Sequence, residues 1–165
     1  NAIVEAGKIE AMLPRDQIVE LDMSVALSPN FSQGHYTLAF VNSQSGDAQA
    51  AIASSDHARE LSPFDPLLFA MLGARALALM RLGRHDEAAD WALKATARPN
   101  AHVHILGIAG HCLALAGRHD DAQRIMASIR ASVPGYGIDD FLGAFRFDVE
   151  ATALIRRVAP QLGWH

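Results

Sequence analysis

Apolar residues along the chain follow two alternating helical patterns. In residues 67–79 almost every position is apolar, which predicts a helix that is buried on most sides. In residues 84–97 apolar residues recur at spacings of three and four, with charged residues between them. This second pattern predicts an amphipathic helix with one face in water. Gly83 lies between the two stretches and is placed to end the first helix, so together they predict a helical hairpin.

The hairpin pattern repeats with a period of about 34 residues. The prolines that mark this period are separated by 34, 36 and 35 residues, and the turn glycines by 37 and 34 residues. The prolines are Pro29, Pro63, Pro99 and Pro134, and the glycines are Gly46, Gly83 and Gly117. A hairpin of this kind cannot cover its own apolar face, so the repeat predicts a stack of hairpins.

The repeat resembles the tetratricopeptide repeat (TPR) family. That family has a small residue in the first helix, a turn glycine, alanines early and late in the second helix, and a closing proline. These positions fall at Ala39, Gly46, Ala51, Ala58 and Pro63, then at Ala76, Gly83, Ala88, Ala95 and Pro99, then at Gly110, Gly117, Ala122 and Pro134. The helix-A tryptophan of the family is absent. The resemblance implies an all-α fold, a right-handed superhelix of antiparallel helix pairs with about three full repeats.

We predict three segments in the chain. Residues 15–134 form the array and begin with a lone helix at 15–28, and residues 135–165 form capping helices at about 138–145 and 148–159, with Asp148 as an N-cap. Residues 1–14 form an N-terminal segment, in which 1–2 are consistent with a cloning scar, and the missing initiator Met suggests a fragment of a longer protein. Helix 15–28 has surplus apolar surface, which we expect residues 3–13 or a homodimer to bury.

Composition narrows the classes of function. Half of the residues (50%) are hydrophobic, which predicts a packed core. The formal net charge is −4, which argues against a basic groove that binds nucleic acid. Cys112 is the only cysteine, which excludes an internal disulfide and a multi-cysteine zinc site. No apolar run is long enough to span a membrane, and no catalytic or phosphate-binding motif is present. We therefore predict a cytoplasmic, non-enzymatic protein without a cofactor or metal.

The TPR resemblance also implies a candidate binding site, because the first helices of successive repeats line a concave face on which peptides bind. The residues that fall on this face are Gln33, Tyr36, Phe40, Gln44, Gly73, Arg75, Leu77, Arg81, His104, Gly107 and His111. Gly73 and Gly107 are 34 residues apart and serve either helix packing or the floor of a groove. Arg75 either pairs within the fold or holds a carboxylate, and the apolar members fit the core equally well.

The leading hypothesis is a non-catalytic TPR interaction module that binds a peptide, a partner domain or a second copy of itself. Residues 63–76 and 99–106 resemble the C-terminal TPR region of bacterial signalling proteins, in which the array follows a class III adenylate/guanylate cyclase or a winged-helix DNA-binding domain. The resemblance implies a regulatory arm, and the net charge and the short apolar runs predict no direct contact with nucleic acid or membrane. The alternatives are a small-molecule sensor, with Arg75, His104 and His111 as polar contacts, or an oligomerisation module that buries the face of residues 3–27.

Overall fold

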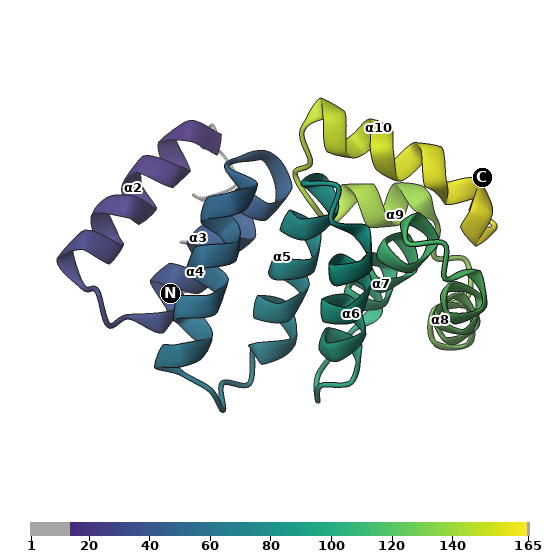
Figure 1. The fold of residues 1–165 in the computed structure, drawn as a ribbon, viewed down its shortest axis with the longest axis horizontal. Coiled ribbons are helices and arrows are strands. Elements are labelled where there is room, and N and C mark those ends of the chain that lie inside the picture. The colour runs from purple at the N-terminus through teal and green to yellow at the C-terminus, as the bar shows by residue number, and fades with distance from the viewer. Residues whose placement is uncertain (1–13, 165) are drawn as a thin grey trace.

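The structure is a computed structural model that describes residues 14–164, with side chains from Val19 onward (Figure 1). The described residues form nine α-helices and a final 3-10 helix, and they contain no strand. The elements are α2 (Pro14–Leu27), α3 (Ser32–Ser45), α4 (Ala48–Leu61), α5 (Leu68–Arg81), α6 (His85–Thr96), α7 (Val103–Leu115), α8 (His119–Ser132), α9 (Ile138–Gly143), α10 (Val149–Val158) and η1 (Ala159–Leu162). The all-α prediction is confirmed for these residues, and the TPR superhelix stays a prediction. The expected fold-back of residues 3–13 lies outside the described part.

The helices pack as consecutive hairpins. The pairs α3–α4, α5–α6 and α7–α8 share the most extensive contacts, and neighbouring hairpins meet through α4–α5 and α6–α7 (Figure 1). The first helices of neighbouring hairpins also contact each other, α3 with α5 and α5 with α7. Small side chains allow this close packing, because Ala51, Ala58, Ala88 and Ala95 are fully buried and Ala122 is almost so.

Two of the turn glycines adopt the backbone conformation that favours glycine. Gly83 and Gly117 have φ angles of 76° and 73° just after α5 and α7, in the left-handed region that commonly ends a helix. Gly46 differs, because its φ is −103°. A Cβ atom at Gly46 would collide with the side-chain oxygen of Asn42, which accepts a hydrogen bond from the Asp47 amide at 3.2 Å. This turn therefore needs glycine for space.

The C-terminal elements cover the last hairpin. Phe141 of α9, Ile155 of α10 and Leu162 of η1 are fully buried, and Trp164 is 6% exposed. Asp148 caps α10 as predicted, since its carboxylate accepts a hydrogen bond from the Ala151 amide at 2.7 Å. Helix α9 ends at Gly143, two residues before the expected end, and the chain then continues without helical structure to α10.

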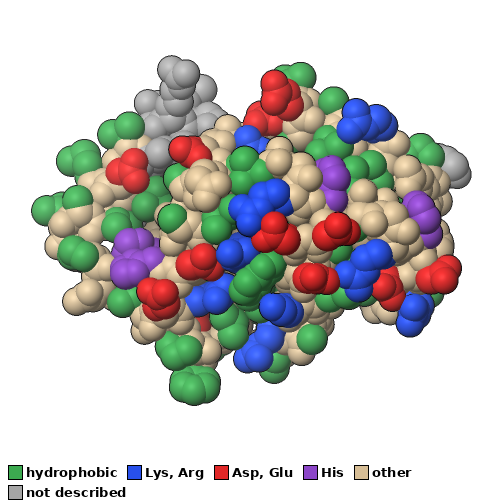
Figure 2. All heavy atoms as spheres, viewed as in Figure 1, with side chains coloured by type: hydrophobic (Ala, Val, Ile, Leu, Met, Phe, Trp, Pro, Cys, Tyr) green, Lys and Arg blue, Asp and Glu red, His purple; other side chains and the backbone are tan. Residues whose placement is uncertain are grey.

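Helix α2, the first helix of the described part of the chain, exposes an apolar stripe to solvent. The stripe consists of Val19, Met23 and Leu27, which are 59%, 61% and 83% exposed. Figure 2 shows acidic and basic side chains interspersed over the face viewed in Figure 1. Within residues 14–164, no helix is both long and apolar enough to cross a membrane.

Candidate functional site

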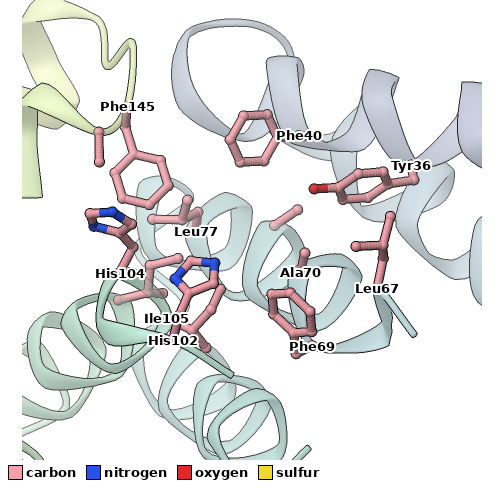
Figure 3. Close-up of a pocket in the computed structure, with 13 residues that line it drawn as sticks. Tyr36, Phe40, Leu67, Phe69, Ala70, Leu77, His102, His104, Ile105 and Phe145 are labelled. Atoms are coloured by element: carbon pink, nitrogen blue, oxygen red, sulfur yellow. The ribbon is translucent and has the colours of Figure 1, made fainter. Parts of the chain in front are cut away.

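A pocket of about 250 Å³ lies where α3, α5 and α7 come together (Figure 3). Its lining comes from the first helices of the three hairpins, the residues just before α5 and α7, and the segment that follows α9. The lining residues are Tyr36, Phe40, Leu67, Phe69, Ala70, Ala74, Leu77, His102, His104, Ile105, Ile108, Ala144 and Phe145. The pocket thus lies on the helices to which the TPR resemblance assigned the predicted binding face.

Helical spacing brings the walls and the floor together. Tyr36 and Phe40 are four residues apart on α3 and so share one face of that helix. Ala70, Ala74 and Leu77 follow on one face of α5, and the two alanines leave the floor hollow because each carries only a methyl group.

Aromatic and imidazole rings surround this floor. Phe40 and Phe145 lie 6.1 Å apart between ring centroids, and Phe145 lies 6.1 Å from His104. His104 in turn lies 5.3 Å from His102, which packs edge-on against Phe69 at 5.4 Å. These separations are typical of favourable contacts between rings. The rings therefore form a nearly continuous wall.

Three polar groups face the pocket from this wall. Tyr36 extends its hydroxyl toward the space between the helices, with His102 across from it (Figure 3). Among the residues that the structure describes, neither the Tyr36 hydroxyl nor the His102 ring has a hydrogen-bond partner. The Nδ1 atom of His104 lies 2.6 Å from the Tyr136 hydroxyl, which leaves its Nε2 atom as the third polar group.

The pocket is electrically neutral near pH 7. His102 is exposed as a residue, but its neighbours cover part of the ring; this partial burial lowers the pKa of His102, and the neighbouring His104 lowers it further. Burial also lowers the pKa of His104, against a smaller opposing effect of Asp140. The pKa of Tyr36 is raised by burial and by the charge of Asp65, so its hydroxyl keeps its proton. No lining residue is Asp, Glu, Lys or Arg.

Residues 144–148, which we call the strap, run from α9 across to α3 and close one edge of the pocket. The Arg146 amide donates a hydrogen bond to the Gln44 side-chain oxygen at 2.6 Å, and the Asp148 amide donates to the Gln44 carbonyl at 3.3 Å. Arg81 donates to the Asp148 carboxylate at 2.9 Å. These contacts hold Phe145 against Phe40, although the two residues are far apart in sequence.

Four of the predicted site residues line the pocket: Tyr36, Phe40, Leu77 and His104. Gln33 is exposed in the first turn of α3 and does not line it. Gln44 and Arg81 are instead committed to the strap, and Arg81 also donates to the carbonyls of Asn42 and Gly46 at the end of α3.

Arg75 points toward the second helices of the hairpins. Its Nε atom donates to Asp56 of α4 at 2.9 Å, and its guanidinium lies 4.2 Å from the ring centroid of Trp91 on α6. The structure therefore agrees with the interpretation of Arg75 as an arginine paired within the fold.

The remaining three predicted residues have packing contacts. A Cβ atom at Gly73 would lie 3.1 Å from Ile105 Cδ1, and one at Gly107 would lie 2.6 Å from Phe141 Cδ2. His111 is buried beneath the C-terminal cap, where its Nδ1 atom donates to the Gly107 carbonyl at 2.8 Å and its ring stacks on Phe141 at 4.7 Å. Burial lowers the pKa of His111 to about 4.

The sequence analysis missed Phe69, His102 and Phe145 as lining residues. Phe69 is the second residue of α5 and His102 directly precedes α7, so both lie outside the positions that the TPR resemblance assigned to the predicted binding face. Phe145 was assigned to the cap, and it is brought to α3 by the contacts of the strap with Gln44 and Arg81. A signal for His102 was its position two residues before His104, after the closing proline of a repeat.

No model of a known protein family matches the chain, and no curated protein matches it either. Within the described residues, no group of three or more His, Cys, Asp or Glu side chains is placed to hold a metal ion. The arrangement offers ring contacts and neutral hydrogen bonds, which are suited to binding.

Proposed function

We propose that the protein is a non-catalytic binding module of the TPR type, which holds its partner at the pocket between α3, α5 and α7. One observation carries the proposal: an apolar pocket on the first helices contains a few polar groups without partners inside the described fold. A concave apolar site with a small number of placed polar groups is the usual form of a binding site.

The size of the pocket favours a side chain of a partner protein. Its volume of about 250 Å³ lies below the roughly 300–1,000 Å³ that is typical of small-molecule sites. The strap also shortens the groove, because Phe145 stands at its edge. We therefore propose that a peptide or protein partner inserts one apolar side chain into the pocket as an anchor. The rest of the partner would make few contacts with the concave face formed by α3, α5 and α7.

A small-molecule sensor is the second candidate. The partial closure of the pocket by Phe145 favours it, and Tyr36, His102 and His104 would supply the polar contacts. In this candidate Arg75 and His111 take no part, because Arg75 pairs with Asp56 and His111 lies beneath the cap.

Residues 63–76 and 99–106 resemble the C-terminal TPR region of bacterial signalling proteins, and this resemblance supports a role within a larger protein. We propose that the module is a regulatory arm of a bacterial signalling protein, whose catalytic or DNA-binding domain responds to what the pocket holds. The pocket would then be the input site, and the ends of the hairpin stack would transmit its occupancy.

Selection of peptides from a random library on the immobilised protein tests this function. We expect the selected peptides to share one apolar anchor residue. They should lose most of their binding to an Ala70→Leu variant, because the added side chain fills the floor of the pocket. Ala53→Leu is the matched control, since Ala53 is exposed on α4. Peptides that bind the folded Ala70→Leu variant as well as the control would contradict the proposal.

A further inference from the structure

We infer that the pocket recognises one uncharged aromatic ring with a hydrogen-bonding group on its edge, as in the tyrosine or tryptophan side chain of a protein partner. The inference rests on the proposed function and names the chemistry of the anchor. Three features of the pocket carry it: its size and rings, its lack of charge, and its unpaired polar groups.

The size and the rings of the pocket select a single aromatic group. An apolar cavity of about 150 Å³ is known to hold one benzene molecule, so about 250 Å³ has room for one phenol or indole ring. Such a ring would lie among Tyr36, Phe40, Phe69 and Phe145, whose rings could contact it edge-to-face or in offset stacking. Ala70 and Ala74 carry only methyl groups and so leave room for the ring at the floor of the pocket.

The absence of charged side chains from the lining disfavours the binding of ionised ligands. A charged group moved from water into an apolar pocket loses its hydration and needs a partner of opposite charge. The lining has no carboxylate, guanidinium or ammonium group. The lowered pKa values of His102 and His104 keep both rings neutral near pH 7. A neutral ring therefore fits the pocket better than an aromatic acid or amine.

The unpaired polar groups of the pocket favour a ligand that carries a hydrogen-bonding group on the edge of its ring. The Tyr36 hydroxyl and the His102 ring face the pocket from opposite walls (Figure 3). Neither has a hydrogen-bond partner among the described residues. A ligand without polar atoms would strip water from both groups and leave them unpaired, which weakens binding. A phenol hydroxyl or an indole N–H would restore a hydrogen bond, because a hydroxyl and a neutral imidazole each accept as well as donate.

Titration of the protein with side-chain analogues tests the inference directly. The probes are p-cresol and 3-methylindole, compared with toluene, benzoate and benzylammonium, and binding is followed by NMR chemical shifts. We expect the two polar neutral rings to bind about tenfold more tightly than toluene. We expect both charged probes to bind more weakly than toluene.

Variants separate the hydrogen bonds from the shape of the pocket. Tyr36→Phe should reduce the preference for p-cresol over toluene to about threefold or less, and leave toluene binding unchanged. His102→Phe should act in the same direction. His119→Phe is the control, because His119 is exposed at the start of α8. An unchanged preference in both folded pocket variants would overturn the inference.

Peptides distinguish the source of the ring. A peptide with a central tyrosine should bind more tightly than p-cresol, and replacement of that tyrosine by phenylalanine should weaken it by about tenfold. Tight binding of p-cresol without any binding of the peptide would overturn the partner side chain as the source. If toluene and phenylalanine peptides bind as tightly as their polar counterparts, the named chemistry fails while the pocket of the proposed function stands.

Discussion

The two equivalent helix glycines, Gly73 and Gly107, should respond differently to alanine. At Gly107 the new Cβ atom would lie 2.6 Å and 2.8 Å from two ring carbons of Phe141. That ring is fully buried and stacks on His111, so it has little room to move. Overpacking of this kind costs about 1–3 kcal/mol, against a gain of about 1 kcal/mol for alanine over glycine in a helix. Because the contact is this short and the ring is buried, we expect the cost of overpacking to exceed the helical gain, so that Gly107→Ala destabilises the protein by about 1–2 kcal/mol.

Gly73→Ala is the matched comparison. Its nearest neighbour would be Ile105 Cδ1 at 3.1 Å, the end of a flexible side chain that can shift. The helical gain then remains, and we expect a change between zero and about 1 kcal/mol of stabilisation. Urea unfolding followed by circular dichroism measures both variants. A Gly107→Ala protein as stable as the parent, or a Gly73→Ala protein that is the less stable of the two, would refute this packing at α7.

Three further predictions concern the cap, the strap and the hairpin contact. Acidification should destabilise the protein through His111 by up to about 3 kcal/mol, because the folded state holds its pKa at about 4 against 6.5 when unfolded. The free energy of unfolding should therefore fall as the pH drops from 6.5 toward 4. In urea unfolding of His111→Leu, this part of the pH dependence should be absent. Asp148→Asn removes the ion pair with Arg81 and should speed hydrogen exchange of the Arg146 amide, whereas unchanged exchange would show that the strap does not depend on it. Ala88→Arg should cost about 3 kcal/mol and Ala88→Gly about 1 kcal/mol in thermal melts, and equal losses would contradict the tight contact at Ala88.

Local sequence signals predicted the parts of the fold that depend on neighbours in the chain. The period of the turn glycines located the hairpins, because a residue at Gly83 or Gly117 must adopt a positive φ at the end of its helix. The N-cap at Asp148 followed from side-chain chemistry within three residues. Burial of Ala88 followed from its recurrence, since the same close contact is made in each hairpin.

The pocket was only partly predictable, because its lining depends on contacts between distant segments. Helical register placed Tyr36, Phe40 and His104 on the predicted binding face, and all three line the pocket. The position of Phe145 depends on hydrogen bonds between Gln44 and the strap, and no local pattern encodes a pairing across about a hundred residues. Register placed Arg81 on the predicted binding face, but register carries no information on the partners of the side chain, which are backbone carbonyls at the end of α3 and one carboxylate of the strap.

The central claim is that this pocket is the binding site of the protein. The most direct test is to measure whether a bound ring contacts the floor of the pocket. Intermolecular NOEs recorded on the protein saturated with p-cresol should connect the ring protons to the methyl groups of Ala70, Ala74 and Leu77. These residues belong to the lining and to one face of α5. NOEs to the exposed stripe of α2, at Met23 and Leu27, with none to α5 would contradict the claim that this pocket is the binding site.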